Sequence, residues 1–232
     1  MISSNLSSIY KKIFHAASRV NRDPNEITLI AVSKGFFVEA IIEGADCGLR
    51  HFGENRLQEA KEKIQQFNEL TLNKGYKGVK WHFIGHLQTN KVKHVVSLFD
   101  MIHSVDSIEL AHLIDKESEK IKKVQPILIQ IKLSEETTKH GIFEERVTGL
   151  AEFVLSLKNI SFQGLMTMPP FFENPKDARP YFKRLYEIRE LIKERFQIPL
   201  PHLSMGMSRD FEIAIEEGST LVRIGTAIFG ER

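Results

Sequence analysis

A lysine at the end of an apolar segment is the first residue whose chemistry stands out in this sequence. Residues 27–34 read Ile-Thr-Leu-Ile-Ala-Val-Ser-Lys. A short apolar run rich in β-branched residues predicts a strand that is covered on both faces. The amine of Lys34 is then expected beside a low-dielectric core, where the neutral amine is favoured and can form a Schiff base with a carbonyl. The alternative is a lysine whose amine simply reaches into water.

Two turns near the C-terminus are rich in small residues, as anion sites often are. The first contains Ser204, Gly206 and Ser208, and the second contains Gly225 and Thr226. Glycines let backbone N–H groups approach an anion closely, and hydroxyl groups donate hydrogen bonds to phosphate oxygens. A helix over 209–217, opened by Ser208, would add partial positive charge. Each turn alone could be an ordinary turn, but together they predict a phosphate site.

Arg223 precedes the second turn and has apolar neighbours on both sides. A buried arginine needs a hydrogen-bond acceptor. One possible partner is an internal carboxylate, and the other is the ring nitrogen of a ligand. Because arginine can only donate hydrogen bonds, a pyridine nitrogen facing it would stay unprotonated.

The elements that must position these residues alternate between strand and helix. Apolar residues recur at helical spacing over 3–20, before the first strand. The expected strands cover 27–34, 49–52, 79–84, 100–105, 126–133, 160–166, 201–204 and 220–224. The expected helices after the first seven strands cover 37–47, 56–68, 88–97, 106–120, 144–157, 178–196 and 209–217. A polar loop is expected over 134–141.

This alternation predicts a (β/α)₈ TIM barrel with an additional N-terminal helix, formed as one domain by residues 1–232. A doubly wound open sheet is the alternative. In barrels of this type, the loops after strands seven and eight commonly hold a ligand phosphate. The two turns of small residues fall at these places.

Composition and motifs exclude several classes of function. The 32 basic and 30 acidic residues give a net charge of +2, which offers no support for nucleic-acid binding. We find no secretory signal and no apolar run of about 20 residues that could span a membrane. The single cysteine, Cys47, is expected to be a small buried residue in a reducing, cytoplasmic compartment. His82 and His86 flank a strand end without an acidic partner nearby in sequence, so no metal site is expected.

Six motifs together resemble those of the pyridoxal phosphate homeostasis proteins, and they extend over residues 31–230. They are Ala31-Val32-Ser33-Lys34, Phe52-Gly53-Glu54-Asn55, the segment 81–88 (WHFIGHLQ) with Asn90-Lys91, Gly164-Leu165-Met166, Ser204-Met205-Gly206-Met207-Ser208, and the segment 223–230 (RIGTAIFG). Gly35 and Arg209 depart from the residues usual in the family, and neither is a proposed anchor.

The resemblance implies a barrel similar to the N-terminal domain of bacterial alanine racemase. It implies that Lys34 holds pyridoxal 5′-phosphate (PLP) as an internal aldimine and that Arg223 faces the pyridine nitrogen. The residues implied around the ring are Asn55, Ile84 and Met166. Those implied around the phosphate are Ser204, Gly206, Ser208, Gly225 and Thr226. The implied function is intracellular PLP homeostasis, meaning buffering and delivery of PLP to PLP-dependent apo-enzymes with effects on amino-acid and keto-acid balance, without established catalysis.

Two enzyme classes remain as alternatives. An alanine-racemase-like isomerase needs an acid and a base on opposite faces of the substrate carbon. The four tyrosines, Tyr10, Tyr76, Tyr181 and Tyr186, are all expected away from the strand ends, and the chain ends soon after the last strand. We therefore expect no efficient racemisation. A lysine aldolase-type barrel that binds a sugar phosphate without a cofactor is the other alternative. A monomer is expected.

Overall fold

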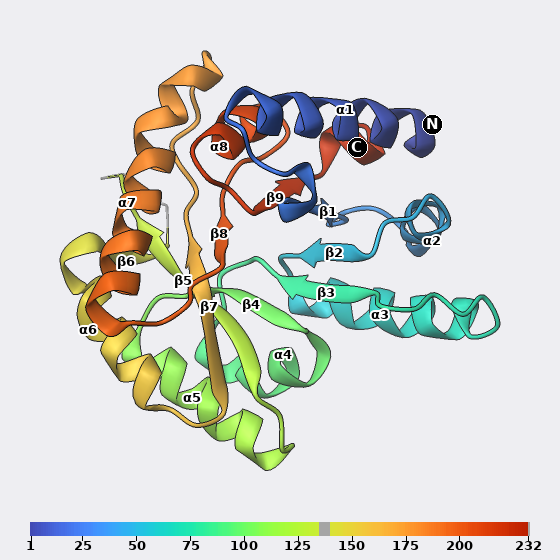
Figure 1. Cartoon of the computed structure of the whole chain (residues 1–232). Coiled ribbons are helices and arrows are strands. Elements are labelled where there is room, and N and C mark those ends of the chain that lie inside the picture. The colour runs from blue at the N-terminus through green and yellow to red at the C-terminus, as the bar shows by residue number, and fades with distance from the viewer. Residues whose placement is uncertain (135–139, 232) are drawn as a thin grey trace.

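Eight parallel strands close into a barrel in the computed structural model, which describes residues 1–134 and 140–231 (Figure 1). In order around the barrel they are β1 (Thr28–Val32), β2 (His51–Glu54), β3 (Lys80–Phe83), β4 (Met101–Val105), β5 (Gln125–Lys132), β7 (Ile160–Met166), β8 (His202–Ser204) and β9 (Leu221–Ile224). The ring closes because β9 pairs with β1 and β4 pairs with β5. The (β/α)₈ prediction is confirmed, and the open-sheet alternative is wrong.

Helices surround this barrel on its outer side (Figure 1). They are α1 (Ile2–Arg19), α2 (Val38–Asp46), α3 (Leu57–Thr71), α4 (Val92–Leu98), α5 (Ile108–Lys120), α6 (Glu144–Ser156), α7 (Arg179–Phe196), α8 (Phe211–Glu216) and α9 (Thr226–Phe229). Short 3₁₀ turns cover η1 (Pro24–Glu26), η2 (Thr89–Lys91) and η3 (Pro175–Ala178). None of the described helices is both long enough and apolar enough to cross a membrane.

Apolar side chains form two separate layers. The larger layer lies between the strands and the helices, and it includes Ile41, Phe52, Phe99 and Phe182, which are fully buried. The smaller layer fills part of the barrel interior with Ile30, Leu128, Met166 and Leu221. Strands covered on both faces in this way explain the nearly continuous apolar runs of the sequence.

The N-terminal helix packs against the last elements of the chain, and Figure 1 shows the two termini close together. The Asn5 side chain donates a hydrogen bond to the carbonyl of Ile228 over 2.9 Å. Just beyond α1, Arg22 Nη1 donates to the carbonyls of Ile215 and Ser219 over 2.7 and 2.9 Å. These bonds satisfy carbonyls at the end of α8 and in the turn that leads to β9.

Several sequence-based boundaries need correction. The first strand ends at Val32, so Lys34 lies in the following turn, and the helix expected from 209 begins only at Phe211. The sequence also failed to predict the two-residue strand β6 (Ile142–Phe143) and helix α9. Cys47 is exposed, because it caps the C-terminal end of α2. Most of the predicted loop 134–141 lies outside the described residues.

Candidate functional site

A cavity of about 630 Å³ opens at the C-terminal ends of the barrel strands. This volume is within the range of small-molecule sites, roughly 300–1,000 Å³. Its lining includes many of the residues selected from the sequence, namely Lys34, Asn55, Ile84, Ser208, Arg223, Gly225 and Thr226. They come from the ends of β1, β2, β3, β8 and β9, which the closed barrel brings to one rim.

Three other selected residues lie below or beside this cavity. Met166 and Ser204 are fully buried, Met166 in the apolar layer inside the barrel. Gly206 has a φ of +89°, and a Cβ there would lie 2.6 Å from the Cβ of Ala214 on α8. Gly206 therefore allows the turn after β8 to pack closely on α8. That these three residues contact a ligand stays a prediction.

Lys34 lies in a tight turn directly after β1. The N–H of Phe36 donates to the carbonyl of Ser33 over 3.1 Å, which closes the turn around Lys34 and Gly35. Gly35 has a φ of +76°, the left-handed region that a type II turn requires at its third residue. The turn directs the chain away from the barrel toward α2 while it keeps Lys34 at the cavity.

A buried polar network holds both sides of this turn. Lys63 Nζ, on α3, donates to the Ser33 carbonyl over 2.7 Å and to Glu54 Oε1 over 2.9 Å. Ser33 Oγ donates to the same Glu54 oxygen over 2.7 Å. Glu59 accepts from Lys63 over 2.5 Å and also from the Gly35 N–H. Burial raises the pKa of Glu54, and its hydrogen bond from Lys63 opposes this shift.

The sequence analysis did not identify this network as a support for Lys34. Glu54 is fully buried and belongs to the Phe-Gly-Glu-Asn motif, while Glu59 and Lys63 are four residues apart on α3. A charged residue within an apolar strand motif and an i, i+4 ion pair were the available signals.

The two turns of small residues meet at the opposite side of the cavity from the β3 loop. Thr226 Oγ1 lies 3.1 Å from Ser208 Oγ, although the two residues are 18 positions apart in the chain. A Cβ on Gly225 would lie 3.1 Å from the Val32 carbonyl oxygen, so a side chain would crowd β1 there. The N–H of Met207 donates to Asp210 Oδ1 over 2.6 Å, which closes the turn before α8.

Arg223 extends from β9 into the barrel at the base of the cavity and is 3% exposed. Its Nη1 donates to Ser204 Oγ over 2.5 Å, and its Nη2 donates to the Thr167 carbonyl over 3.0 Å. Burial lowers the pKa of Arg223 to about 10, and the charge of Asp210 opposes this shift. The guanidinium stays protonated at neutral pH, held by a hydroxyl and a carbonyl.

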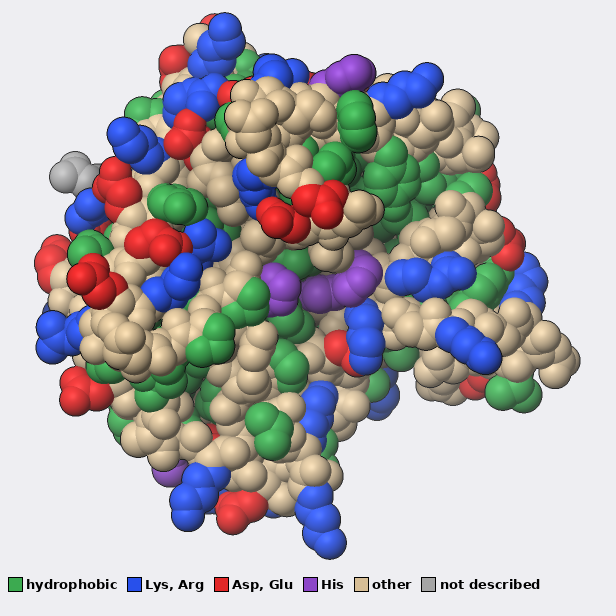
Figure 2. All heavy atoms as spheres, in the orientation of Figure 1, with side chains coloured by type: hydrophobic (Ala, Val, Ile, Leu, Met, Phe, Trp, Pro, Cys, Tyr) green, Lys and Arg blue, Asp and Glu red, His purple; other side chains and the backbone are tan. Residues whose placement is uncertain are grey.

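Three histidines continue from Ser204 through the barrel interior as a hydrogen-bonded chain. His103 Nδ1 lies 2.9 Å from Ser204 Oγ, and its Nε2 lies 2.9 Å from His82 Nδ1. His82 Nε2 in turn lies 2.9 Å from His51 Nδ1. His82 and His103 are buried, while His51 is half-buried. On the surface, Figure 2 shows histidine side chains gathered in the central hollow of the face that it draws.

Arg223 sets the direction of every bond in this chain. Arginine only donates hydrogen bonds, so Ser204 Oγ accepts from Arg223. Among the described residues, the Ser204 hydroxyl then donates its proton to His103 Nδ1. His103 then carries its proton on Nε2 and donates to His82, and His82 donates from Nε2 to His51 in the same way. Burial lowers the pKa of His82 to about 3 and that of His103 well below its usual range, so both rings stay neutral.

The cavity also carries features that suit a pyridine ring with a phosphate and an aldehyde. Asn55 Oδ1 is buried without a hydrogen-bond partner among the described residues and lies at the cavity. Two hydroxyls and a glycine face it from the turns after β8 and β9, and a lysine faces it from the turn after β1. Together they provide an unpaired acceptor, an anion cradle and an amine.

A closed (β/α)₈ barrel with a lysine and an anion cradle on its C-terminal rim defines a class of ligand-binding barrel. The chain belongs to the alanine racemase N-terminal domain family, whose profile matches residues 5–232, and within it to the pyridoxal phosphate homeostasis proteins.

Relatives of this kind align with nearly the whole chain. The pyridoxal phosphate homeostasis protein of Aquifex aeolicus (strain VF5) is 46% identical over 227 residues, covering 98% of this chain and 96% of that protein. Its counterpart in Escherichia coli (strain K12) is 41% identical over 237 residues, covering 100% of this chain and 97% of that protein.

Solved structures show the same barrel. PipY of Synechococcus elongatus PCC7942, solved with PLP bound, has a TM-score of 0.86 at 32% identity and covers 99% of this chain and 100% of its own. Alanine racemase of Clostridium difficile 630 has a TM-score of 0.67 at 14% identity, with 96% of this chain and 59% of its own covered, and it shares the fold alone.

Proposed function

We propose that this protein binds PLP and serves intracellular PLP homeostasis by buffering the cofactor and delivering it. The observation that carries the proposal is the convergence of Lys34, Arg223 and the Ser208–Thr226 cradle on one cavity. The names of relatives at 41–46% identity and the PLP-bound PipY structure support it.

Each group in the cavity has a part in holding the cofactor. The amine of Lys34 would hold the aldehyde of PLP by a covalent and reversible attachment. Ser208, Gly225 and Thr226, with the turn that Ser204 and Gly206 begin, would receive the phosphate. Arg223 would face the pyridine nitrogen as a donor and keep it unprotonated. Asn55, Ile84 and Met166 would surround the ring.

An unprotonated ring nitrogen makes PLP a weaker electron sink, which suits a carrier better than an enzyme. The racemase-like alternative needs a second acid or base facing the substrate. Among the described residues that line the cavity there is no tyrosine. We therefore propose that the protein acts without turnover, as a cytoplasmic monomer in which residues 1–232 form one domain and PLP-dependent apo-enzymes receive the cofactor.

Absorption of the purified chain tests the attachment. Wild-type protein reconstituted with PLP should show the absorbance of a lysine-bound cofactor, and Lys34→Ala should lose it. Lys93→Ala, an exposed lysine on α4, is the matched control and should absorb like wild type. Borohydride reduction followed by peptide mapping should place a pyridoxyl group on Lys34.

Two results would overturn the proposal. A wild-type chain that takes up no PLP would remove the binding function, and a pyridoxyl group on another lysine would remove Lys34 from its role. Conversion of L-alanine to D-alanine well above the rate with free PLP would instead favour the isomerase.

A further inference from the structure

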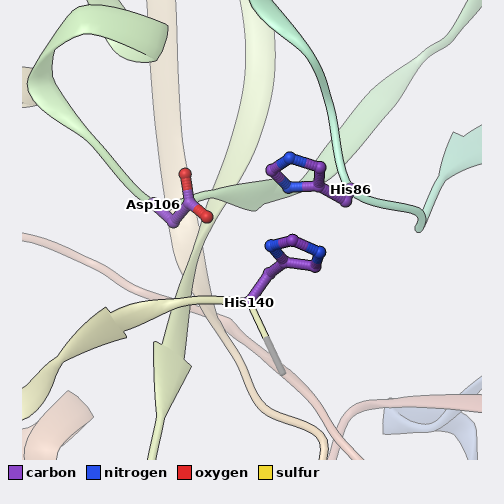
Figure 3. A group of neighbouring side chains, drawn as sticks. All are labelled: His86, Asp106 and His140. Carbon is purple, nitrogen blue, oxygen red and sulfur yellow. The ribbon is translucent and has the colours of Figure 1, made fainter. Parts of the chain in front are cut away.

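Two histidines and an aspartate lie together at the rim of the barrel, His86, Asp106 and His140 (Figure 3). Their potential ligand atoms all lie within 4.8 Å of one another. His86 follows β3, Asp106 follows β4 and His140 lies in the segment after β5, and these three strands are neighbours in the barrel. The parallel strands therefore bring three residues from separate loops to one point.

Contacts that do not involve the imidazole nitrogens of His86 and His140 fix the backbone around this cluster. The carbonyl of His140 accepts a hydrogen bond from the buried Gln130 side chain over 2.8 Å. The N–H of Gly141 donates to the Asp106 carboxylate, which ties the β5 loop to the β4 loop. A Cβ on Gly85 would lie 2.1 Å from the Asn55 carbonyl oxygen, so the chain before His86 packs tightly on the end of β2.

The two imidazoles stack on each other beside the carboxylate. Their ring centroids are 3.6 Å apart and the planes differ by 10°, and Figure 3 shows the Asp106 carboxylate next to both rings. A neutral imidazole offers a lone pair, and this is the form that binds metal ions.

We propose that His86, Asp106 and His140 bind a divalent transition-metal ion, with Zn²⁺ as the preferred occupant. Two imidazoles and one carboxylate suit Zn²⁺ and its neighbours in the first row, whereas Ca²⁺ and Mg²⁺ prefer all-oxygen sites. Donors about 2.0–2.1 Å from a tetrahedral ion lie roughly 3.3 Å apart. Because the ligand atoms lie up to 4.8 Å apart, binding requires the exposed side chains of His86 and His140 to rotate inward.

Three protein ligands leave one position of a tetrahedral ion open. In known zinc proteins, closed sites are structural, and sites with an open position bind water or a substrate group. His86 and His140 line the same cavity as Lys34. The fourth position is therefore expected to take water or an anionic group of a molecule that enters this cavity. This inference does not depend on PLP binding.

Titration with Co²⁺, a spectroscopic substitute for Zn²⁺, tests the site in the full chain freed of PLP and of metal. Wild type should bind one ion per chain with visible ligand-field absorption, and Zn²⁺ should displace it. His86→Ala, His140→Ala and Asp106→Asn should each weaken binding by at least about tenfold, because even changes to groups around the ligands cost 10–100-fold. His112→Ala, an exposed histidine on α5, should bind like wild type.

The result is decisive in either direction. Wild-type affinity in His86→Ala or His140→Ala would overturn the proposal, and so would a wild-type chain that binds neither ion. Circular dichroism of each variant at the start of the titration shows that it is folded, and a zinc-induced shift of the His86 and His140 ring resonances in the wild type provides a second reading. Because PLP is absent, failure of the PLP-binding function would leave these outcomes unchanged.

Discussion

The position of the Lys34 backbone depends on charged side chains that do not line the cavity. Lys63 and Glu54 are both buried, and together they hold the Ser33 carbonyl and hydroxyl, while Glu59 holds the Gly35 N–H. These bonds fix the backbone immediately before and after Lys34. At the scale of single residues, the ion pair of Lys63 and Glu54 fixes the position of the turn that carries Lys34.

Removal of one partner from this ion pair should be costly. Lys63→Met leaves Glu54 buried without its cation, and we expect a loss of about 3–5 kcal/mol in the free energy of unfolding. The double variant Lys63→Met/Glu54→Gln should lose less than the sum of the two single variants, because the uncompensated charge is gone. Urea denaturation measures these values, and additive losses would contradict a direct pairing.

An exposed ion pair provides the matched control. Lys120, which is exposed, bonds to the partly exposed Glu117 on α5. Lys120→Met should change the free energy of unfolding by only about 0–1 kcal/mol.

The chain from Arg223 to His51 links five strands through the barrel interior. It connects β9, β8, β4, β3 and β2 through polar side chains that occupy positions inside the barrel. TIM-barrel interiors are usually filled by bulky branched residues. Here the polar chain leaves the guanidinium of Arg223 with a fixed orientation, which is what a donor to a ring nitrogen requires.

Histidine tautomers test the direction of this chain. Nitrogen-15 NMR of the wild type should show His51, His82 and His103 as neutral rings with the proton on Nε2. Ser204→Ala should release this constraint on His103 and should cost about 1–3 kcal/mol, because it leaves buried partners unpaired. An Nδ1-protonated ring in the wild-type chain would contradict the assigned direction.

Ser104→Ala is the appropriate control for that experiment. Ser104 is buried on β4 next to His103, but its hydroxyl has no hydrogen-bond partner among the described residues. Its removal should leave the tautomers unchanged and cost little stability.

At the scale of the whole molecule, the buried histidines make stability depend on pH. The pKa of His82 falls to about 3 and that of His103 falls well below its usual range, both chiefly because of burial. In the unfolded chain these groups titrate near pH 6.5. Between pH 6.5 and about 3 the unfolded chain binds more protons, so these histidines lower the free energy of unfolding as the pH falls.

Denaturation in urea at several pH values measures this effect. The contribution of His82 should be fully present above pH 6.5, and below it stability should fall by up to about 1.4 kcal/mol per pH unit. His82→Gln should remove this part of the slope, and His112→Gln should not. Burial raises the pKa of Glu54, Asp106 and Asp210, which opposes the fall in the wild type and in both variants alike. An unchanged slope in His82→Gln would contradict a neutral buried ring.

The sequence by itself determined the barrel, because apolar periodicity and βα alternation are local properties that each strand and helix carries alone. It also placed Lys34, Arg223 and the two turns of small residues at one end of the barrel, since the rules of barrel topology place strand ends on one rim, and the structure has them around one cavity. The predicted end of the first strand and the predicted start of α8 are a few residues wrong. The turns at these places are closed by hydrogen bonds from the Gly35 N–H to Glu59 and from the Met207 N–H to Asp210, which the local pattern does not show.

Only the tertiary structure decided which residues support the site. Glu54 and Lys63 meet across β2 and α3, the chain from Arg223 to His51 crosses five strands, and His86, Asp106 and His140 come from three loops. None of these groups is close enough in sequence to show a spacing motif. Their contacts exist because the closed barrel brings strands that are far apart in the chain within hydrogen-bonding distance, and that closure is a property of the whole fold.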